Sequence, residues 1–218
     1  MKNTIFFILL AVSLFTASTA VNAQTTTFSK AAGSGSGSIG EFSEWRATVG
    51  KTEIGVRDNG SLTRISDGKK LALKLDKGDS FSQNVFVADH AGDLLLLSEV
   101  SNGPDGAGVL YRIDGKTFKE KWRAPITSFN LSAGLIEGEN AYVTAHGFVG
   151  KVDLKTGKFI WKHNDLYRKF TPDGAFNVIE TGKIDGNNII FEELREGRSP
   201  ARLIVDKSSG KIINASVK

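Results

Sequence analysis

One short stretch, residues 152–161, constrains the fold more than any other part of the chain. It reads Val-Asp-Leu-Lys-Thr-Gly-Lys-Phe-Ile-Trp. The carboxylate of Asp153 can accept hydrogen bonds from the backbone N–H groups that follow it, and Gly157 supplies the positive φ that closes a tight turn. Apolar residues flank this turn on both sides. The stretch therefore predicts a strand, a turn and a second strand that ends at Trp161.

Imperfect copies of this hairpin recur along the chain. In residues 109–122, Asp114 precedes Trp122 by eight residues, which is the spacing between Asp153 and Trp161. Such a repeat predicts one structural unit used several times.

Two further copies are weaker. Residues 203–213 keep Asp206 and Gly210 but have Asn214 where tryptophan would fall. Residues 62–71 contain a shorter turn and no tryptophan, with Ile65 as the apolar residue before the turn. The four apolar residues that precede the turns lie 48, 39 and 53 residues apart. This spacing fits a four-stranded unit of about 40–45 residues with loop insertions.

The rest of the mature chain is typical of an all-β protein. From Glu41 onward, short apolar runs alternate with turn signals every 8–12 residues or so, and no helical periodicity stands out. Each unit accommodates four strands, and a single sheet of this size cannot bury both of its apolar faces alone. The sequence predicts a β-propeller of about four four-stranded blades, either a closed small ring or an open arc. The predicted blades cover residues 41–77, 80–125, 128–163 and 175–217.

The hairpin at residues 152–161 resembles the PQQ-like repeat, the blade of the quinoprotein-dehydrogenase-like propellers. A looser match covers residues 113–122, and a partial one covers residues 205–213. The quinoprotein enzymes of this superfamily have eight blades, with a quinone and calcium in the central channel, and many place vicinal cysteines beside the quinone. This chain is about half that length and has no cysteine, so we carry over no cofactor residue and predict no cofactor. The superfamily also has non-enzymatic members.

The first 23 residues predict an export signal. A lysine at position 2 precedes an apolar run from Ile5 to Phe15, and small residues at 21–23 suit cleavage before Gln24. The run is too short to span a bilayer, which takes about 20 apolar residues. Residues 24–40 are rich in Thr, Ser, Ala and Gly and predict a flexible linker. We expect a protein exported to a bacterial periplasm or the extracellular space, with no membrane span after cleavage.

Composition excludes several functional classes. Because there is no cysteine, the chain has no disulfide, no thiolate metal site and no cysteine nucleophile. The net charge of +4 is mild, and the basic residues are scattered near acidic ones, so no nucleic-acid partner is predicted. The three histidines show no metal-ligand spacing, so no metal site is predicted.

The predicted function is a non-catalytic binding or scaffolding module that contacts a protein or small ligand through loops on one face. A homodimer that completes a larger ring is a further expectation. One alternative is a propeller enzyme, a quinone-dependent oxidoreductase or a hydrolase; another is a degenerate remnant of a longer propeller. No catalytic residue is assigned. The candidate contact loop has a basic and aromatic sequence: Tyr167, Arg168, Lys169 and Phe170.

Overall fold

Strands make up most of the protein in a computed structural model that describes residues 24–34, 44–76, 78–101, 106–170, 175–193 and 201–216. The predicted signal segment and residues 35–40 of the predicted linker lie outside these ranges. Four antiparallel sheets are present, and within each sheet consecutive strands along the chain are neighbours. We call them blades one to four.

Blade one contains β4 (Glu44–Val49), β5 (Thr52–Arg57), β6 (Ser61–Arg64) and β7 (Lys70–Ala72), and blade two contains β8 (Ser80–His90), β9 (Asp93–Ser101), β10 (Gly106–Ile113) and β11 (Glu120–Ile126). Blade three contains β12 (Leu135–Glu137), β13 (Asn140–Ala145), β14 (Phe148–Asp153) and β15 (Phe159–His163). A short helix, α1 (Leu166–Lys169), leads towards blade four, which contains β16 (Lys183–Asp185), β17 (Asn188–Glu193), β18 (Ala201–Asp206) and β19 (Ile212–Ser216).

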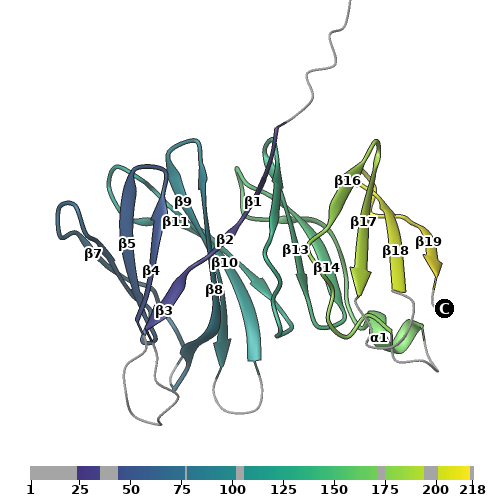
Figure 1. Ribbon diagram of the computed structural model, residues 1–218, viewed down its shortest axis with the longest axis horizontal. Helices are drawn as coiled ribbons and strands as arrows, with labels where there is room; N and C mark the ends of the chain where they lie inside the picture. Colours follow the sequence, from purple (N-terminus) through teal and green to yellow (C-terminus); the bar gives the residue numbers. More distant parts are fainter. Residues whose placement is uncertain are drawn as a thin grey trace, which may run out of the picture.

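The blades stand side by side in chain order along the longest axis (Figure 1). Three hydrophobic clusters fill the spaces between consecutive blades, one cluster for each of the three interfaces. Within the described ranges no cluster joins blade four to blade one. Of the two predicted arrangements, the structure has the open arc of propeller blades.

The two outward faces of the row are more polar than the spaces between blades. Blade one presents Glu44, Arg46 and Arg57 to solvent, with ion pairs among them. Blade four presents the ion pair Arg202–Glu192. Polar outer faces are what the end units of a stacked array need in order to remain soluble.

The N-terminal segment differs from the flexible linker that its composition predicts. Residues Thr25–Ser34, which we call the clasp, form three short strands: β1 (Thr25–Thr27), β2 (Ser29–Lys30) and β3 (Ala32–Ser34). They pair antiparallel with the first strands of blades three, two and one, respectively. The clasp runs across these blades in Figure 1.

Buried side chains and backbone pairing together explain why the clasp is ordered. Phe28 is buried in the cluster between blades two and three, and Ala31 in the cluster between blades one and two. The N–H of Phe28 donates to the carbonyl of Gly134 at 2.9 Å. Gly134 must be small here, because a Cβ would lie 2.9 Å from the Phe28 ring. Strand pairing uses main-chain groups, so the Ser and Gly residues of this segment do not prevent it, and its threonines favour strands.

Each tryptophan of the repeat joins its blade to the next blade. The indole Nε1–H of Trp122 donates to the carbonyl of Leu154 in blade three at 3.1 Å, and that of Trp161 donates to the carbonyl of Lys207 in blade four at 3.0 Å. Both carbonyls belong to the residue that follows a turn aspartate. Asn214, at the equivalent position of blade four, has no following blade within the described residues.

The turn glycine of the receiving blade packs on this tryptophan. A Cβ at Gly157 would lie 2.6 Å from the Trp122 ring, and one at Gly210 would lie 2.5 Å from the Trp161 ring. Both glycines have positive φ, at 71° and 75°. Glycine is therefore required twice over, by backbone conformation and by the neighbouring indole.

A cation on the third strand of each of the first three blades reinforces the same contact. These side chains donate to a carbonyl just after the turn position of the next blade: Arg64 to Gly115, Arg112 to Leu154 at 2.6 Å, and Lys151 to Lys207 at 2.9 Å. Tryptophan and cation thus share one acceptor where both are present.

The first turn is aligned differently from the sequence prediction. The N–H of Arg64 bonds the Lys69 carbonyl and the Gly68 N–H bonds the Arg64 carbonyl, which is the pattern that closes the turn at Asp153. Arg64, and not Asp67, therefore occupies the turn-aspartate position. The predicted alignment, with Ile65 before a shorter turn, was wrong because the turn-aspartate position of this copy carries no acidic residue.

The residue before the turn shifts as well. Thr63, and not Ile65, corresponds to the buried Val152, and Ile65 is 42% exposed. This position faces the preceding blade in blades two to four. Blade one has no preceding blade in the described part of the chain, so a polar residue is tolerated there.

Two of the turn aspartates, Asp114 and Asp206, have lowered pKa values that make the stability of the protein depend on pH in the acid range. Hydrogen bonds from the Thr117 N–H, the Lys121 side chain and the Thr117 hydroxyl hold the pKa of Asp114 well below its usual value. Those from the Ser208 hydroxyl and the Ser209 N–H do the same for the pKa of Asp206.

We expect the protein to lose stability as the pH falls below about 4, the usual pKa of an unfolded aspartate. A carboxyl whose pKa is lower when folded stabilises the fold above the unfolded pKa, and this contribution disappears as protons bind. The melting temperature at pH 5 and at pH 2.5 measures the loss. Asp114→Asn with Asp206→Asn should flatten the dependence, and Asp185→Asn, at the exposed end of β16, is the control. Equal slopes in all three proteins would contradict the assignment.

Candidate functional site

Three aromatic rings from separate segments meet at the ends of blades two and three. The Phe129 ring stacks on the His146 imidazole, with centroids 4.8 Å apart and an interplanar angle of 9°. The Tyr167 ring also contacts the imidazole, with centroids 4.9 Å apart and the two planes tilted by 46°. The Arg168 guanidinium lies 5.4 Å from the Tyr167 ring. Phe129 follows β11, His146 is in the β13–β14 turn and Tyr167 is in α1, so the rings come together only in the fold.

These rings surround an open cavity of about 300 Å³. We call the cavity and its rings the aromatic pocket. Polar groups complete the lining, and Phe129 is 40% exposed although it is large and apolar. The nine lining residues are Gly106, Thr127, Ser128, Phe129, His146, Phe148, Asn164, Asp165 and Tyr167.

The turn that carries His146 is held by its neighbours. The His146 N–H donates to the Phe129 carbonyl at 2.7 Å, and the Ser128 hydroxyl donates to the His146 carbonyl at 2.5 Å. The Gly147 carbonyl accepts from the Leu166 N–H at 2.9 Å. These bonds fix the imidazole between the two other rings before any ligand arrives.

Two backbone features support the same geometry. Gly147 has φ of 60°, and a Cβ there would lie 2.3 Å from the Tyr167 ring, so only glycine fits. Asn130 and Asp165 also have positive φ, at 53° and 55°. Non-glycine residues in this region cost conformational energy and concentrate at binding sites.

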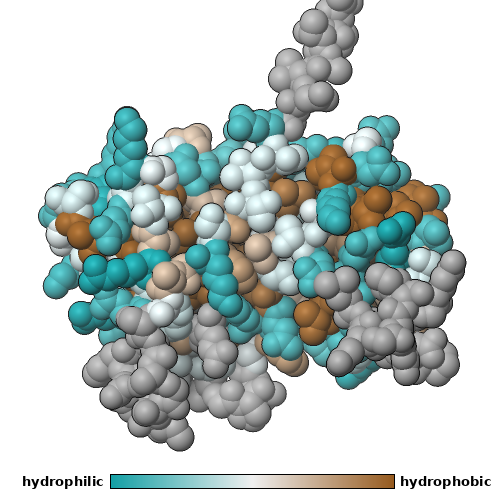
Figure 2. All heavy atoms as spheres, viewed as in Figure 1, coloured by the Kyte–Doolittle hydropathy of each residue, from teal (hydrophilic) through white to brown (hydrophobic). Residues whose placement is uncertain are grey.

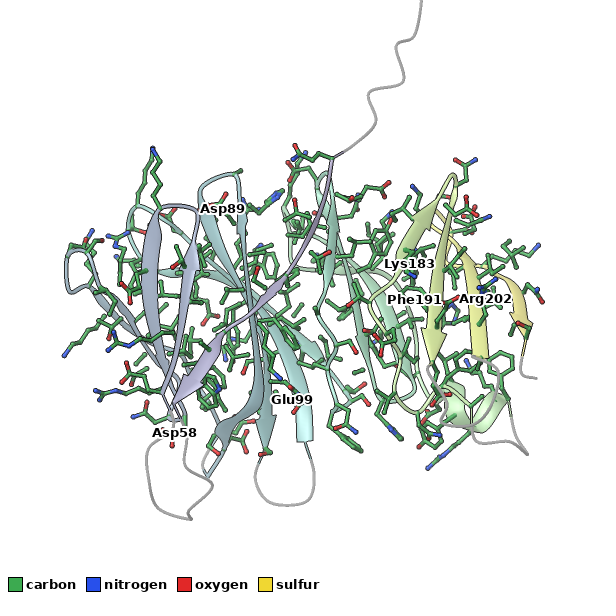
Figure 3. The ribbon with its side chains drawn as sticks, in the orientation of Figure 1. Asp58, Asp89, Glu99, Lys183, Phe191 and Arg202 are labelled. Atoms are coloured by element: carbon green, nitrogen blue, oxygen red, sulfur yellow. The ribbon has the colours of Figure 1, made fainter. Side chains whose placement is uncertain are left out.

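The loop that carries Phe129 is tied down by an acidic residue of blade two. Glu99, at the lower end of β9 in Figure 3, accepts from the Leu131 N–H at 2.6 Å and from the Asn84 amide at 3.2 Å. Glu99 is 8% exposed. A buried carboxylate that accepts backbone N–H groups makes strong, directional bonds, so the Phe129 side of the pocket is preorganised too.

The predicted contact loop divides between this site and the core. Tyr167 lines the pocket and Arg168 lies on its ring. Lys169 is exposed at the end of α1. Phe170 packs against Phe176, with ring centroids 5.2 Å apart, beside the cluster between blades three and four. The first three residues are accessible to a partner, and Phe170 anchors the segment.

Sequence reasoning overlooked two pocket residues, Phe129 and His146. The sequence favours ordinary loop or strand-end positions for the three histidines, and two of them lie at strand ends. His90 ends β8 and lies 3.3 Å from the Glu139 carboxylate, and His163 ends β15 and lies 2.7 Å from the Gly210 carbonyl. No linear motif links positions 129, 146 and 167. The sequence offered one signal for this site, a large apolar residue, Phe129, directly before the turn-forming Asn130.

Several titratable groups in other parts of the fold have shifted pKa values. They are found at the turns and between blades, as with Asp67, whose pKa falls to about 2 beside Arg64, and Tyr111, whose pKa burial raises to about 12. Among the described residues no group of three or more His, Asp or Glu side chains is placed to hold a metal ion. In the same part of the chain no helix is long and apolar enough to cross a membrane.

Comparisons with known proteins assign no family to this chain. No family model and no curated protein matches this sequence. Apo AztD from Citrobacter koseri is similar in structure, with 14% identity over 78% of this chain and 45% of that chain and a TM-score of 0.46. The WD40 domain of SCAP from fission yeast has 10% identity over 90% of this chain and 49% of that chain, with a TM-score of 0.38. This chain thus spans about half the length of either, and at these TM-scores we assign the propeller fold from the sheet order alone.

Proposed function

We propose that this chain is an exported PQQ-like repeat protein that acts as a non-catalytic binding module, and that the aromatic pocket is where it takes hold of a protein partner. The observation that carries the proposal is the cluster of Phe129, His146 and Tyr167 around an open cavity, in which Phe129 stacks on His146 and Tyr167 is tilted against it. Export rests on residues 1–23, and the repeat family rests on the hairpin at residues 152–161.

The pocket has the properties of a protein-contact site. Aromatic side chains in a preorganised setting lose little conformational freedom on binding and dominate the energetics of interfaces. Phe129 exposes apolar surface that the isolated protein leaves in water. Arg168 and Asp165 at the rim supply charge for orientation. A partner segment that places one ring or aliphatic side chain in the cavity would satisfy all of these groups.

A capture experiment tests the proposal. The mature chain is immobilised, exposed to the envelope fraction of its native cell, and retained proteins are identified and then purified for affinity measurement. We expect Phe129→Ala with Tyr167→Ala to weaken the affinity at least tenfold, the size of an interface hot spot. Ile160→Ala and Ile213→Ala, at exposed positions away from the pocket, should change it less than twofold. Melting curves confirm that all variants fold. If every retained protein binds the pocket variant as well as the wild type, the proposal fails.

A further inference from the structure

The first strands of blades three and four match in length, in the turn that follows and in register with the second strand. β12 and β16 each have three residues, and each is joined to the next strand by a two-residue turn with glycine first. Ile136 pairs with Ala141 in the middle of one hairpin, and Ile184 pairs with Ile189 in the middle of the other. The segment that pairs with β12 therefore indicates what kind of segment could pair with β16.

The clasp pairs with the edge of β12 that faces away from β13. Thr26 of β1 lies opposite Ile136. In a two-residue hairpin the pair next to the turn exchanges hydrogen bonds across the hairpin, and the next pair does not. The N–H and C=O of Ile136 therefore point outward, towards β1. By the same alternation, the N–H and C=O of Ile184 point outward from blade four.

No strand covers β16 within the described ranges. It is the edge strand of its sheet, whereas the corresponding edges of blades one, two and three are each paired with part of the clasp. Lys183 and Asp185 are exposed, and Ile184 is only half-buried, in contrast to the buried Leu135 and Ile136 of β12. Lys183 is labelled on blade four in Figure 3, and Figure 2 shows hydrophobic residues at the surface in the area of β16 and β17. An open edge of this kind is a template for another strand.

The clasp is one step too short to reach this edge after the expected cleavage. From Thr26 opposite β12 to Gly33 opposite β4 it advances 33 − 26 = 7 residues over two blades. At about 3.3 Å per residue, 3.5 residues match the roughly 10 Å spacing of stacked sheets. Moving the same 3.5 residues upstream from Thr26, which would bring the segment to blade four, gives residues 22 and 23. The expected cleavage before Gln24 removes both of them.

We propose that the β16 edge accepts an extended segment of another protein by main-chain strand pairing, in the way that the clasp pairs with β12. Its chemistry follows from the clasp: small polar side chains such as threonine beside the strand, with main-chain groups providing the affinity. In Figure 1, β16 lies near the top of blade four, whereas α1, which carries Tyr167 of the aromatic pocket, lies at the bottom. The inference does not depend on the proposed function.

The clasp supplies its own probe. A fluorescein-labelled peptide with the sequence of residues 25–30, TTTFSK, is titrated with the mature chain, residues 24–218, and binding is followed by anisotropy. We expect saturable binding that Ile184→Pro weakens at least tenfold, because proline removes the outward N–H. Lys183→Ala should change the affinity less than twofold, since recognition is through the backbone.

Controls separate loss of binding from loss of folding. Ile184→Pro removes no ladder bond of blade four and should melt within a few degrees of the wild type. Ile136→Pro, its counterpart, removes a bond to β1 and should melt lower. No saturable binding up to about 1 mM peptide, a very weak affinity, or equal binding to Ile184→Pro, overturns the proposal. So does loss of binding in a chain that retains residues 18–23, which would show that the chain's own segment fills the edge. A dimer abolished by Ile184→Pro would identify a second copy as the occupant instead.

Discussion

Replacing Trp161 with alanine should lower the free energy of unfolding by about 3–5 kcal/mol, the usual cost of truncating a buried aromatic side chain. The residue is 8% exposed and packs in the cluster between blades three and four. Its indole also donates to the Lys207 carbonyl, which the substitution leaves without that donor. Gly210 packs on the same ring, so blade four also loses this contact with blade three. Urea denaturation measures the change.

Asn214 provides the matched control. It stands opposite Ile204 as Trp161 stands opposite Lys151, at the same place in the repeat. Because no blade follows it in the described chain, Asn214→Ala should cost less than about 0.5 kcal/mol, as for a surface substitution. Similar losses in the two variants would mean that the tryptophan does not act by joining blades.

Replacing Asp93 with alanine is the second large effect, again about 3–5 kcal/mol, the typical cost of removing one partner from a buried ion pair. Asp93 accepts from Arg112 at 2.6 Å and from Lys121 at 2.8 Å, and its side chain is 8% exposed. Without it, Arg112 is left nearly buried and loses the carboxylate that aligns it with the Leu154 carbonyl of blade three. Urea denaturation at pH 7 checks the value.

At acid pH the wild type and Asp93→Ala should have nearly the same free energy of unfolding. Burial raises the pKa of Asp93, but hydrogen bonds from Lys121 and Arg112 outweigh it, so the pKa lies below its usual value. The stabilisation is therefore present above about pH 4 and is lost as the pH falls further. Asn140, at the same place in blade three, is the control: Asn140→Ala should cost less than about 1.5 kcal/mol, the range of one ordinary hydrogen bond. A gap between wild type and Asp93→Ala that persists at pH 2.5 would contradict the ion-pair account.

The repeat was predictable because it depends on local chemistry. The turn at Asp153 needs an acceptor and a glycine at fixed spacing, and these can be read along the chain. Strands β4 to β19 lie in or next to the predicted blade ranges, with β11 ending at Ile126, one residue beyond its range. Strands β1, β2 and β3 of the same sheets lie outside these ranges. The absence of tryptophan from the fourth copy also has a physical reason in the structure, since Trp122 and Trp161 each contact the blade that follows.

The clasp was not predictable from composition. Thr25–Ser34 has the small polar residues of a linker, and its order comes from main-chain pairing with three separate blades. Such pairing leaves almost no side-chain pattern. The two buried residues, Phe28 and Ala31, are three positions apart and fall between successive blades, a spacing that becomes meaningful only when the distance between blades is known.

The aromatic pocket was predictable in part. A basic and aromatic segment at Tyr167 stands out in the sequence because it interrupts the strand pattern. Phe129 and His146 do not, because their stacking depends on how the ends of β11, β13 and β15 converge. Long-range convergence of loops is set by the whole stack of blades, and no single segment encodes it.

The central claim is that each tryptophan of the repeat docks on the turn of the following blade. Proton NMR of the mature protein tests it directly through cross-peaks between indole rings and glycine Hα atoms. The account predicts contacts from the Trp122 ring to Gly157 and from the Trp161 ring to Gly210, together with slow exchange of both indole N–H groups. Indole rings that show contacts only within their own sheet, with freely exchanging N–H groups, would contradict it.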